Sequence, residues 1–114
     1  MNPTPSTHRF RAYDQSLEAI RLARAPLARI RRADRSLADQ LQRAAASVAL
    51  NLAEGARRRG RDRAHFYRIA AGSAAEARGC FDIAVAFGAV ETAEVAEAWR
   101  AFDAVVAMLY PLTR

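Results

Sequence analysis

The sequence predicts an all-α protein, an antiparallel up-down-up-down bundle of four helices, on three observations. Alanine, the strongest helix former, is the commonest residue. Apolar residues recur every three or four positions, the period of a helix that buries one face, and the alternation typical of strands is absent. The segments with this period are joined by short connections, which make consecutive helices antiparallel. With 114 residues the chain has the length of one domain, residues 1–114, of which we expect 1–11 to be a mobile tail.

The first predicted helix runs from about residue 12 to residue 33. Proline lacks a backbone donor and clashes with the preceding helical turn. We therefore expect Pro26 to kink this helix or to break it into two shorter ones. The apolar stripe of the helix is formed by Tyr13, Leu17, Ile20, Leu27 and Ile30.

The second predicted helix spans about residues 36–55. Ser36 is a typical N-cap residue, because a serine oxygen can accept a hydrogen bond from a free backbone N–H of the first turn. Gly55 is the predicted stop. The apolar face is formed by Leu37, Leu41, Ala44, Ala45, Val48 and Leu52.

Two further helices are predicted over about residues 62–87 and 92–110. Asp62 can cap the third helix, and Gly88 lies just beyond its end, where glycine is favoured. The inward-facing residues of the third helix are predicted to be Phe66, Ile69, Ala70, Ser73, Ala77, Cys80, Phe81, Ala84 and Phe87. The fourth helix begins at Thr92 and has a coiled-coil-like spacing of Val95, Trp99, Phe102, Val106 and Leu109.

The charge is strongly positive and unevenly distributed. All 18 basic residues are arginines, the formal net charge is +6, and residues 1–78 hold 16 arginines against 7 acidic residues. Such an excess favours a polyanionic partner. The single cysteine, Cys80, excludes an internal disulfide, and no run approaches the length of a membrane span. We expect a cytoplasmic protein without a membrane segment, metal or cofactor.

The arginines are predicted to gather at one end of the bundle. In an up-down-up-down bundle the connection between the second and third helices lies at the same end as both chain termini. Guanidinium groups there can bind a nucleic-acid backbone without reading sequence, and Tyr13, Phe66 and Tyr67 could supply stacking near the same end of the bundle. The alternative is a solvated loop that keeps the protein soluble. We call this predicted cluster the arginine pole; it comprises Arg57, Arg58, Arg59, Arg61, Arg63, Arg9 and Arg11.

A second cluster of arginines is predicted at the opposite end, and there we favour a solvated surface. Glu91 and Glu94 follow the third helix and can neutralise part of this cluster. Its members are Arg29, Arg31, Arg32 and Arg35.

Polar residues form a stripe beside the apolar face of the second helix. Buried polar groups are tolerated when they are hydrogen-bonded, so the stripe predicts a structural network with the third helix that fixes helix register. A sharper but less favoured interpretation makes Glu54 and Glu76 a general acid and base. The predicted network comprises Arg43, Ser47, Asn51, Glu54, Ser73 and Glu76.

Two further features extend the range of hypotheses. Arg59 and His65 are separated by five residues, a spacing that resembles the motif of the RNA-cleaving HEPN domains, although Gly60 stands where that family usually has a polar residue. Leu50 projects away from the apolar face of its helix, and Val85 and Val90 are hard to place in one bundle. Several such residues predict self-association.

The second and third helices resemble those of the four-helix-bundle family of 23S rRNA intervening-sequence proteins. The resemblance rests on Asn51, Leu52, Ala53, Glu54 and Gly55, and on Gly72, Ser73 and Glu76. It implies a small non-catalytic bundle that assembles into a five-membered ring and binds nucleic acid. The family is similar to accessory proteins of diversity-generating retroelements, basic pentamers that engage a reverse transcriptase and nucleic acid.

The sequence thus predicts a non-catalytic oligomeric bundle that binds an RNA or DNA backbone through its arginine-rich ends. The alternatives are a scaffold for a protein partner with no nucleic-acid role and, least favoured, a HEPN-like ribonuclease.

Overall fold

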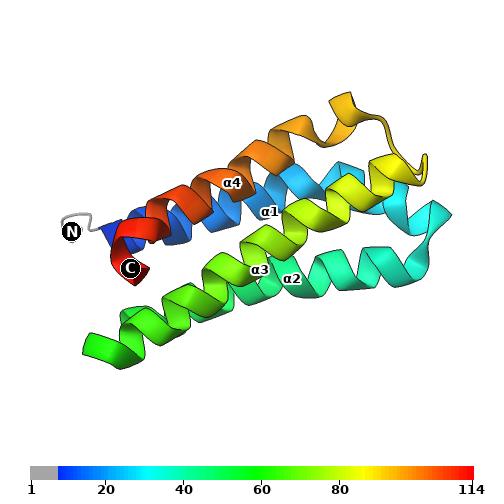
Figure 1. Ribbon diagram of the computed structural model, residues 1–114. Helices are drawn as coiled ribbons and strands as arrows, with labels where there is room; N and C mark the ends of the chain where they lie inside the picture. The colour runs from blue at the N-terminus through cyan, green and yellow to red at the C-terminus, as the bar shows by residue number, and fades with distance from the viewer. Residues whose placement is uncertain (1–7) are drawn as a thin grey trace.

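The protein folds as four antiparallel α-helices in the computed structural model, which describes residues 8–114, with side chains from Arg11 onward. The helices are α1 (His8–Ala33), α2 (Arg35–Ala56), α3 (Gly60–Ala86) and α4 (Thr92–Thr113). Both α1 and α3 pack against α2 and α4, so the four helices enclose one core (Figure 1). The all-α fold is confirmed, while the ring stays a prediction. Most of the predicted tail lies outside the described residues, and α1 begins four residues before the predicted start.

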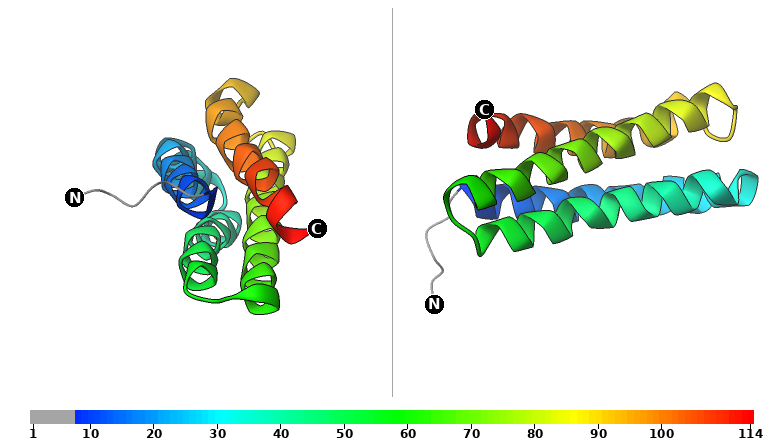
Figure 2. Two further views of the ribbon diagram at one scale, coloured as in Figure 1. Left: turned by 90° about the vertical axis from the view of Figure 1, so that its left-hand side faces the viewer. Right: turned by 60° about the horizontal axis from the view of Figure 1, so that its bottom comes forward.

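The two ends of the bundle carry different connections. Residues 57–59 join α2 to α3 at the end where α1 begins and α4 ends (Figures 1 and 2). Asp34 alone joins α1 to α2 at the other end, next to the link of residues 87–91 between α3 and α4. The topology therefore places the α2–α3 connection beside the start of α1 and the end of α4, as the sequence predicted.

Pro26 lies inside α1 without breaking it. The helix is continuous from His8 to Ala33, and Pro26 is buried. The prediction of two shorter helices is wrong. Most helical stability comes from packing of the apolar face, and here Ala19, Ala23 and Ile30 anchor the helix to the core on both sides of the proline.

The ends of α2 differ from the prediction at both the cap and the stop. Asp34 is the N-cap, and its carboxylate accepts the backbone N–H of Leu37 at 3.0 Å, while Ser36 is exposed within the first turn. Gly55 lies inside the helix with an ordinary helical backbone, since the positive-φ glycines are Gly60 and Gly88. Gly55 is instead a point of close approach: a Cβ there would lie 2.5 Å from Cε1 of Tyr67.

The buried face of α3 includes Ala70, Ala77, Cys80, Phe81 and Ala84, as predicted, but differs from the prediction near both ends of the helix. Tyr67 is buried in the core, whereas Ile69 is at the surface and Phe87 is 79% exposed. Alanines occupy several sides of this helix, so the apolar pattern alone does not decide which residues near its ends face the core. Val90, which looked hard to place, is buried, and Leu50 is 68% exposed as predicted. The predicted end of α3 is confirmed, because Gly88 has φ +80° directly after the last helical turn.

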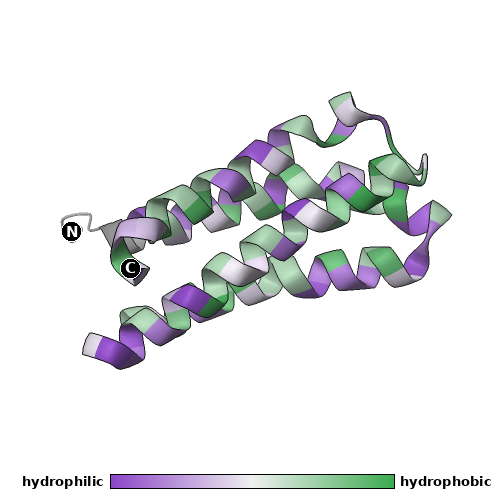
Figure 3. Cartoon of the chain, in the orientation of Figure 1, coloured by the Kyte–Doolittle hydropathy of each residue, from purple (hydrophilic) through white to green (hydrophobic). Residues whose placement is uncertain are grey.

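The core is thin because alanine supplies much of it. Small side chains let neighbouring helices approach closely, and the larger groups Phe81, Phe102 and Leu41 fill the centre. Hydrophilic residues follow the outer sides of the helices (Figure 3). Fully buried alanines include Ala12, Ala19, Ala38, Ala70, Ala74, Ala77 and Ala84.

Candidate nucleic-acid interface

The arginine pole is assembled at the end of the bundle where α1 begins and α4 ends. Arg57 and Arg59 lie in the α2–α3 connection, and Arg61 and Arg63 lie in the first turn of α3 (Figure 2). Arg11 is exposed near the start of α1, at the same end. The side chain of Arg9 lies outside the described residues. The topology therefore gathers residues that are some fifty positions apart in the chain.

Two arginines of the pole are held by carboxylates. Glu54 accepts Nη2 of Arg58 at 2.7 Å and Nη1 of Arg57 at 3.5 Å. Asp62 lies 3.4 Å from the other terminal nitrogen of Arg58. The hydrogen bond to Glu54 is the main reason why the pKa of Arg58 is raised above its ordinary value. Arg58 is thereby fixed between the end of α2 and the start of α3.

Arg59, Arg61 and Arg63 form no salt bridge with the described residues. Arg59 and Arg61 are exposed, and Arg63 donates its Nε–H to the carbonyl oxygen of Gly55 at 3.3 Å. The same carbonyl, at the C-terminal end of α2, also accepts the backbone N–H of Arg58 at 3.0 Å, so Arg63 adds a second bond to it. Arg59 and Arg61 therefore present uncompensated guanidinium groups to solvent.

The aromatic residues near the pole differ from the predicted set. Tyr67 is buried, so its predicted stacking role is wrong, and Tyr13 packs against the core. Phe66 is half-buried and lies under the guanidinium of Arg58, 4.9 Å from the ring centre. Sequence reasoning did not single out Tyr110, which is exposed at the end of α4 with the guanidinium of Arg114 over its ring.

The predicted polar network is only partly assembled. Ser47 and Ser73 join α2 to α3 through their hydroxyl oxygens at 2.8 Å, and Asn51 donates to the hydroxyl and backbone oxygens of Ser47. Glu76 accepts from Gln40 at 3.3 Å, and Arg43 is exposed without a hydrogen bond to either glutamate. The seam thus has a central serine–serine–asparagine group with separate pairs on either side.

Glu54 and Glu76 do not form an acid–base pair. Glu54 lies beside the arginine pole, whereas Glu76 pairs with Gln40, which is 14 residues away on α2. At 1.5 Å per residue, that separation is roughly 21 Å along the helix. His65 is exposed, and its ring meets Phe66 edge-on at 5.3 Å.

The described residues contain no group of three His, Cys, Asp or Glu side chains that could hold a metal ion. Cys80 is buried, and burial is the main cause that raises the pKa of its thiol. None of the helices within residues 8–114 has the length and apolar character that crossing a membrane requires.

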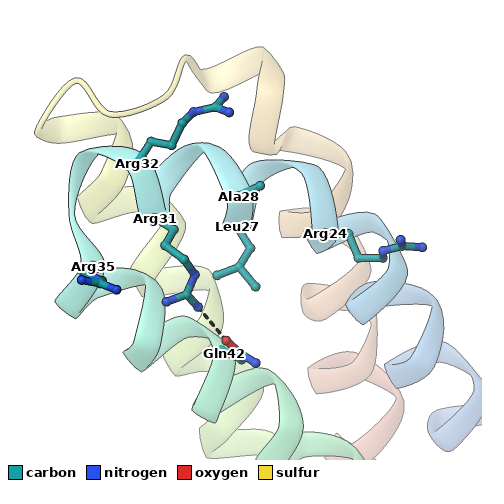
Figure 4. Close-up of a pocket in the computed structure, with 7 residues that line it drawn as sticks. All are labelled: Arg24, Leu27, Ala28, Arg31, Arg32, Arg35 and Gln42. Atoms are coloured by element: carbon teal, nitrogen blue, oxygen red, sulfur yellow. Dashed lines mark hydrogen bonds between the residues drawn. The ribbon is translucent and has the colours of Figure 1, made fainter.

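The second arginine cluster surrounds an open depression of about 600 Å³ at the opposite end of the molecule (Figure 4). Arg31 points into it and donates to Asp39 and Gln42, both at 2.6 Å, and the hydrogen bond from Arg31 lowers the pKa of Asp39. Arg29 pairs with Glu94 at 2.8 Å, as the predicted partial neutralisation requires. The sequence did not reveal the depression or the participation of Arg24, because Arg24 lies about one and a half turns before Arg29, the first residue of the cluster, along α1.

Comparisons with known proteins agree with this architecture. The described fold is similar to the crystal structure of a protein of unknown function from the S23 ribosomal protein family of Bacteroides thetaiotaomicron VPI-5482, with a TM-score of 0.77 and 18% identity. The similarity covers 90% of this chain and 98% of that one. No match was found among curated proteins. The model of the 23S rRNA-intervening sequence protein family matches residues 10–111, and the chain therefore belongs to that family.

Proposed function

We propose that the protein is a non-enzymatic, self-associating protein that binds the phosphate backbone of RNA or DNA through its arginine pole. The observation that carries the proposal is the pair Arg59, in the α2–α3 connection, and Arg61, in the first turn of α3: both are exposed and have no carboxylate partner among the described residues. Arg57 and Arg58 add to the same surface after partial neutralisation by Glu54 and Asp62. Arginine binds phosphate with a planar fork of donors, so this surface suits a backbone more than a base edge.

The way in which the pole is held supports a fixed binding surface. Arg58 spans carboxylates of α2 and α3 and covers Phe66, while Arg63 bonds back to the last turns of α2. These contacts tie the short connection to both helices. The backbone that carries Arg59 and Arg61 is therefore held in place, which reduces the entropy that the connection loses on binding.

Self-association is proposed from apolar groups that a single chain leaves at its surface. Leu50 and Phe87 are mostly exposed, and Ile83 is 44% exposed one turn before Phe87. Copies of the chain joined in a ring would present several poles together and raise the avidity for a long polyanion. Light scattering tests this: we expect a mass above that of one 12.5 kDa chain and a smaller mass for Phe87→Gln. A single-chain mass for the unchanged protein would refute self-association.

Binding to the nucleic-acid backbone is tested with a fluorescent RNA of 20 nucleotides and with duplex DNA of the corresponding sequence. We expect the logarithm of the affinity to fall with the logarithm of salt concentration with a slope of about 0.9 per neutralised phosphate on duplex DNA. The double variant Arg59→Ala, Arg61→Ala should bind more weakly and with a smaller slope. The matched control, Arg32→Ala with Arg35→Ala, removes two exposed arginines from the opposite end and should leave both quantities nearly unchanged.

Two results would refute the proposal. One is an affinity that does not change with salt, and the other is an equal loss for the two double variants, which would indicate only non-specific attraction to net charge. The ribonuclease alternative is tested with the same RNA. Cleavage by purified protein that disappears in His65→Ala would favour the ribonuclease over a non-enzymatic protein.

A further inference from the structure

An apolar groove runs along the seam between α1 and α2 and opens into the arginine-lined depression. The groove has a volume of about 310 Å³, and it shares Arg24, Leu27 and Gln42 with the depression. Its wall from α1 carries Ile20 and Ala23. The two hollows therefore form one continuous surface, aliphatic along the seam and basic at the end where α1 meets α2.

The sequence explains why the seam is open. On the side of α2 the groove is lined by Leu41, Gln42, Ala45 and Ala46, and the single methyl groups of the two alanines leave space open beside the α1 wall. Ala46 is exposed, and Leu27 is only partly buried. The residues that line the hollows along α1, from Ile20 to Arg32, cover about 18 Å at 1.5 Å per residue, or somewhat more than three helical turns.

The chemistry of the walls selects the kind of occupant. Both walls are α-helices, whose backbone N–H and C=O groups are already bonded to each other, so an extended segment lying in the seam would leave its own backbone groups without partners. A helix satisfies its backbone internally and can bury an apolar face in such a groove. The side-chain oxygen of Gln42, which lines the groove, already accepts a hydrogen bond from Arg31.

The charge around the depression selects the sign of the occupant. Arg24, Arg32 and Arg35 form no salt bridge with the described residues, and Figure 4 shows their side chains spread around the rim instead of converging on one point. A spread rim does not suit a single compact phosphate. It matches several carboxylates distributed over the surface of a larger partner.

We propose that this groove, defined by Ile20, Ala23, Leu27, Ala45 and Ala46 and bordered by the arginine rim, docks an amphipathic helix of a protein partner. The docked helix carries aliphatic side chains spaced by three and four residues, and glutamates or aspartates in the turn that meets Arg32 and Arg35. This interaction is separate from the binding of nucleic acid, which is assigned to the opposite end of the bundle.

The test uses a labelled 16-residue synthetic helix with leucines at positions i, i+4, i+7 and i+11 and three glutamates in its last turns. Fluorescence anisotropy should detect binding that weakens with salt. A peptide of identical composition with the leucine spacing scrambled should bind at least about tenfold more weakly, because a few buried anchors supply most of the binding energy at such interfaces. A peptide with glutamine in place of glutamate should also bind more weakly and lose the salt dependence.

Variants of the full chain locate the site. Ala46→Trp fills the groove from an exposed position and should weaken peptide binding about tenfold, the loss of one anchoring contact. Ala53→Trp is the matched control, because Ala53 is exposed on the same helix but does not line the groove. Arg32→Ala with Arg35→Ala should weaken peptide binding and spare RNA binding, and Arg59→Ala with Arg61→Ala should do the reverse. Circular dichroism verifies that each variant is folded.

Each other outcome would overturn the proposal. If the leucine–glutamate peptide does not bind, or if the scrambled peptide binds equally well, the groove does not dock an amphipathic helix. If the glutamine peptide binds equally well, the arginine rim does not select an acidic partner. A reduced mass of the free protein with Ala46→Trp would assign the groove to a second copy of the chain. A loss of RNA affinity with Ala46→Trp would assign it to nucleic acid.

Discussion

Substitution of Gly55 by alanine tests the packing beneath the arginine pole. An added Cβ would lie 2.5 Å from Cε1 and 2.7 Å from Cδ1 of Tyr67, and 3.2 Å from Cβ of Phe66, whereas ordinary contacts begin at 3.4 Å. The ring of Tyr67 would have to move by about 0.9 Å, and it is 1% exposed, so the surrounding core must move with it. Such overpacking costs roughly 1–3 kcal/mol, and the better helix propensity of alanine returns up to about 1 kcal/mol. With about 1 kcal/mol returned, we expect a net destabilisation of about 0–2 kcal/mol.

Gly72→Ala is the matched control for this prediction. Gly72 is exposed in the middle of α3, and an added Cβ meets nothing within 4 Å. This variant should be more stable than the unchanged protein by about 0.5–1 kcal/mol, because alanine restricts the unfolded chain. Unfolding followed by circular dichroism, at one protein concentration, should separate the two variants. Their thermal midpoints should differ by several degrees, and urea unfolding should show the same order of stability. Equal stabilities for Gly55→Ala and Gly72→Ala would refute the close approach of Tyr67.

Three further predictions concern capping and titration. Asp34→Ala should cost about 1 kcal/mol in urea unfolding through loss of the N-cap bond, while Ser36→Ala should change stability by less than about 0.5 kcal/mol. The thiol of Cys80, whose pKa is raised by burial, should react with a disulfide reagent at pH 8 only as fast as the protein opens, and a rapid reaction in the native state would contradict its burial. The pKa of Asp39 is lowered by its hydrogen bond from Arg31, so the ionised carboxylate stabilises the fold above its unfolded pKa of about 3.8, and this contribution is lost on further acidification. Asp39→Asn should therefore reduce the loss of stability in acid, which unfolding at several pH values measures.

The helix number, order and approximate length were predictable because the period of the apolar residues depends on local geometry alone. The end of α3 followed from Gly88, whose positive φ is a local requirement. The burial of Tyr67 in place of Ile69 near the start of α3 was not predictable in the same way. Tyr67 lies against Gly55 on α2, and such a tertiary contact is contained in no local pattern.

The candidate site was predictable as a location but not as a set of contacts. Up-down-up-down topology was enough to place Arg59 and Arg61 at the end with the chain termini. Which arginines would be neutralised depended on side chains one helical turn away, and Glu54 proved to hold Arg58 rather than the serines of the seam. The groove between α1 and α2 was hidden for another reason: it arises from the small size of Ala46 relative to residues on α1, and size mismatch across a seam becomes visible only after the register of the two helices is known.

Glu54 connects stability and binding at the arginine pole, and the two should respond in opposite directions when its charge is removed. Its carboxylate pairs with Arg57 and Arg58, so Glu54→Gln raises the net charge of the pole by one and releases guanidinium groups for phosphate. We expect tighter binding to duplex DNA and a salt slope that increases by up to about 0.9, one additional phosphate contact. Glu18→Gln is the control, because Glu18 pairs with Arg21 in the middle of α1.

The unfolding free energy should fall slightly in Glu54→Gln, since partly exposed ion pairs contribute about 0–1 kcal/mol each. A variant that binds duplex DNA less tightly while remaining folded would contradict this reasoning. Glu54 would then act by holding Arg58 in the geometry that phosphate needs, and the binding surface would depend on the anchored arginine more than on the exposed pair Arg59 and Arg61. The sign of the change in affinity therefore decides whether the pole binds through the number of its free charges or through their fixed arrangement.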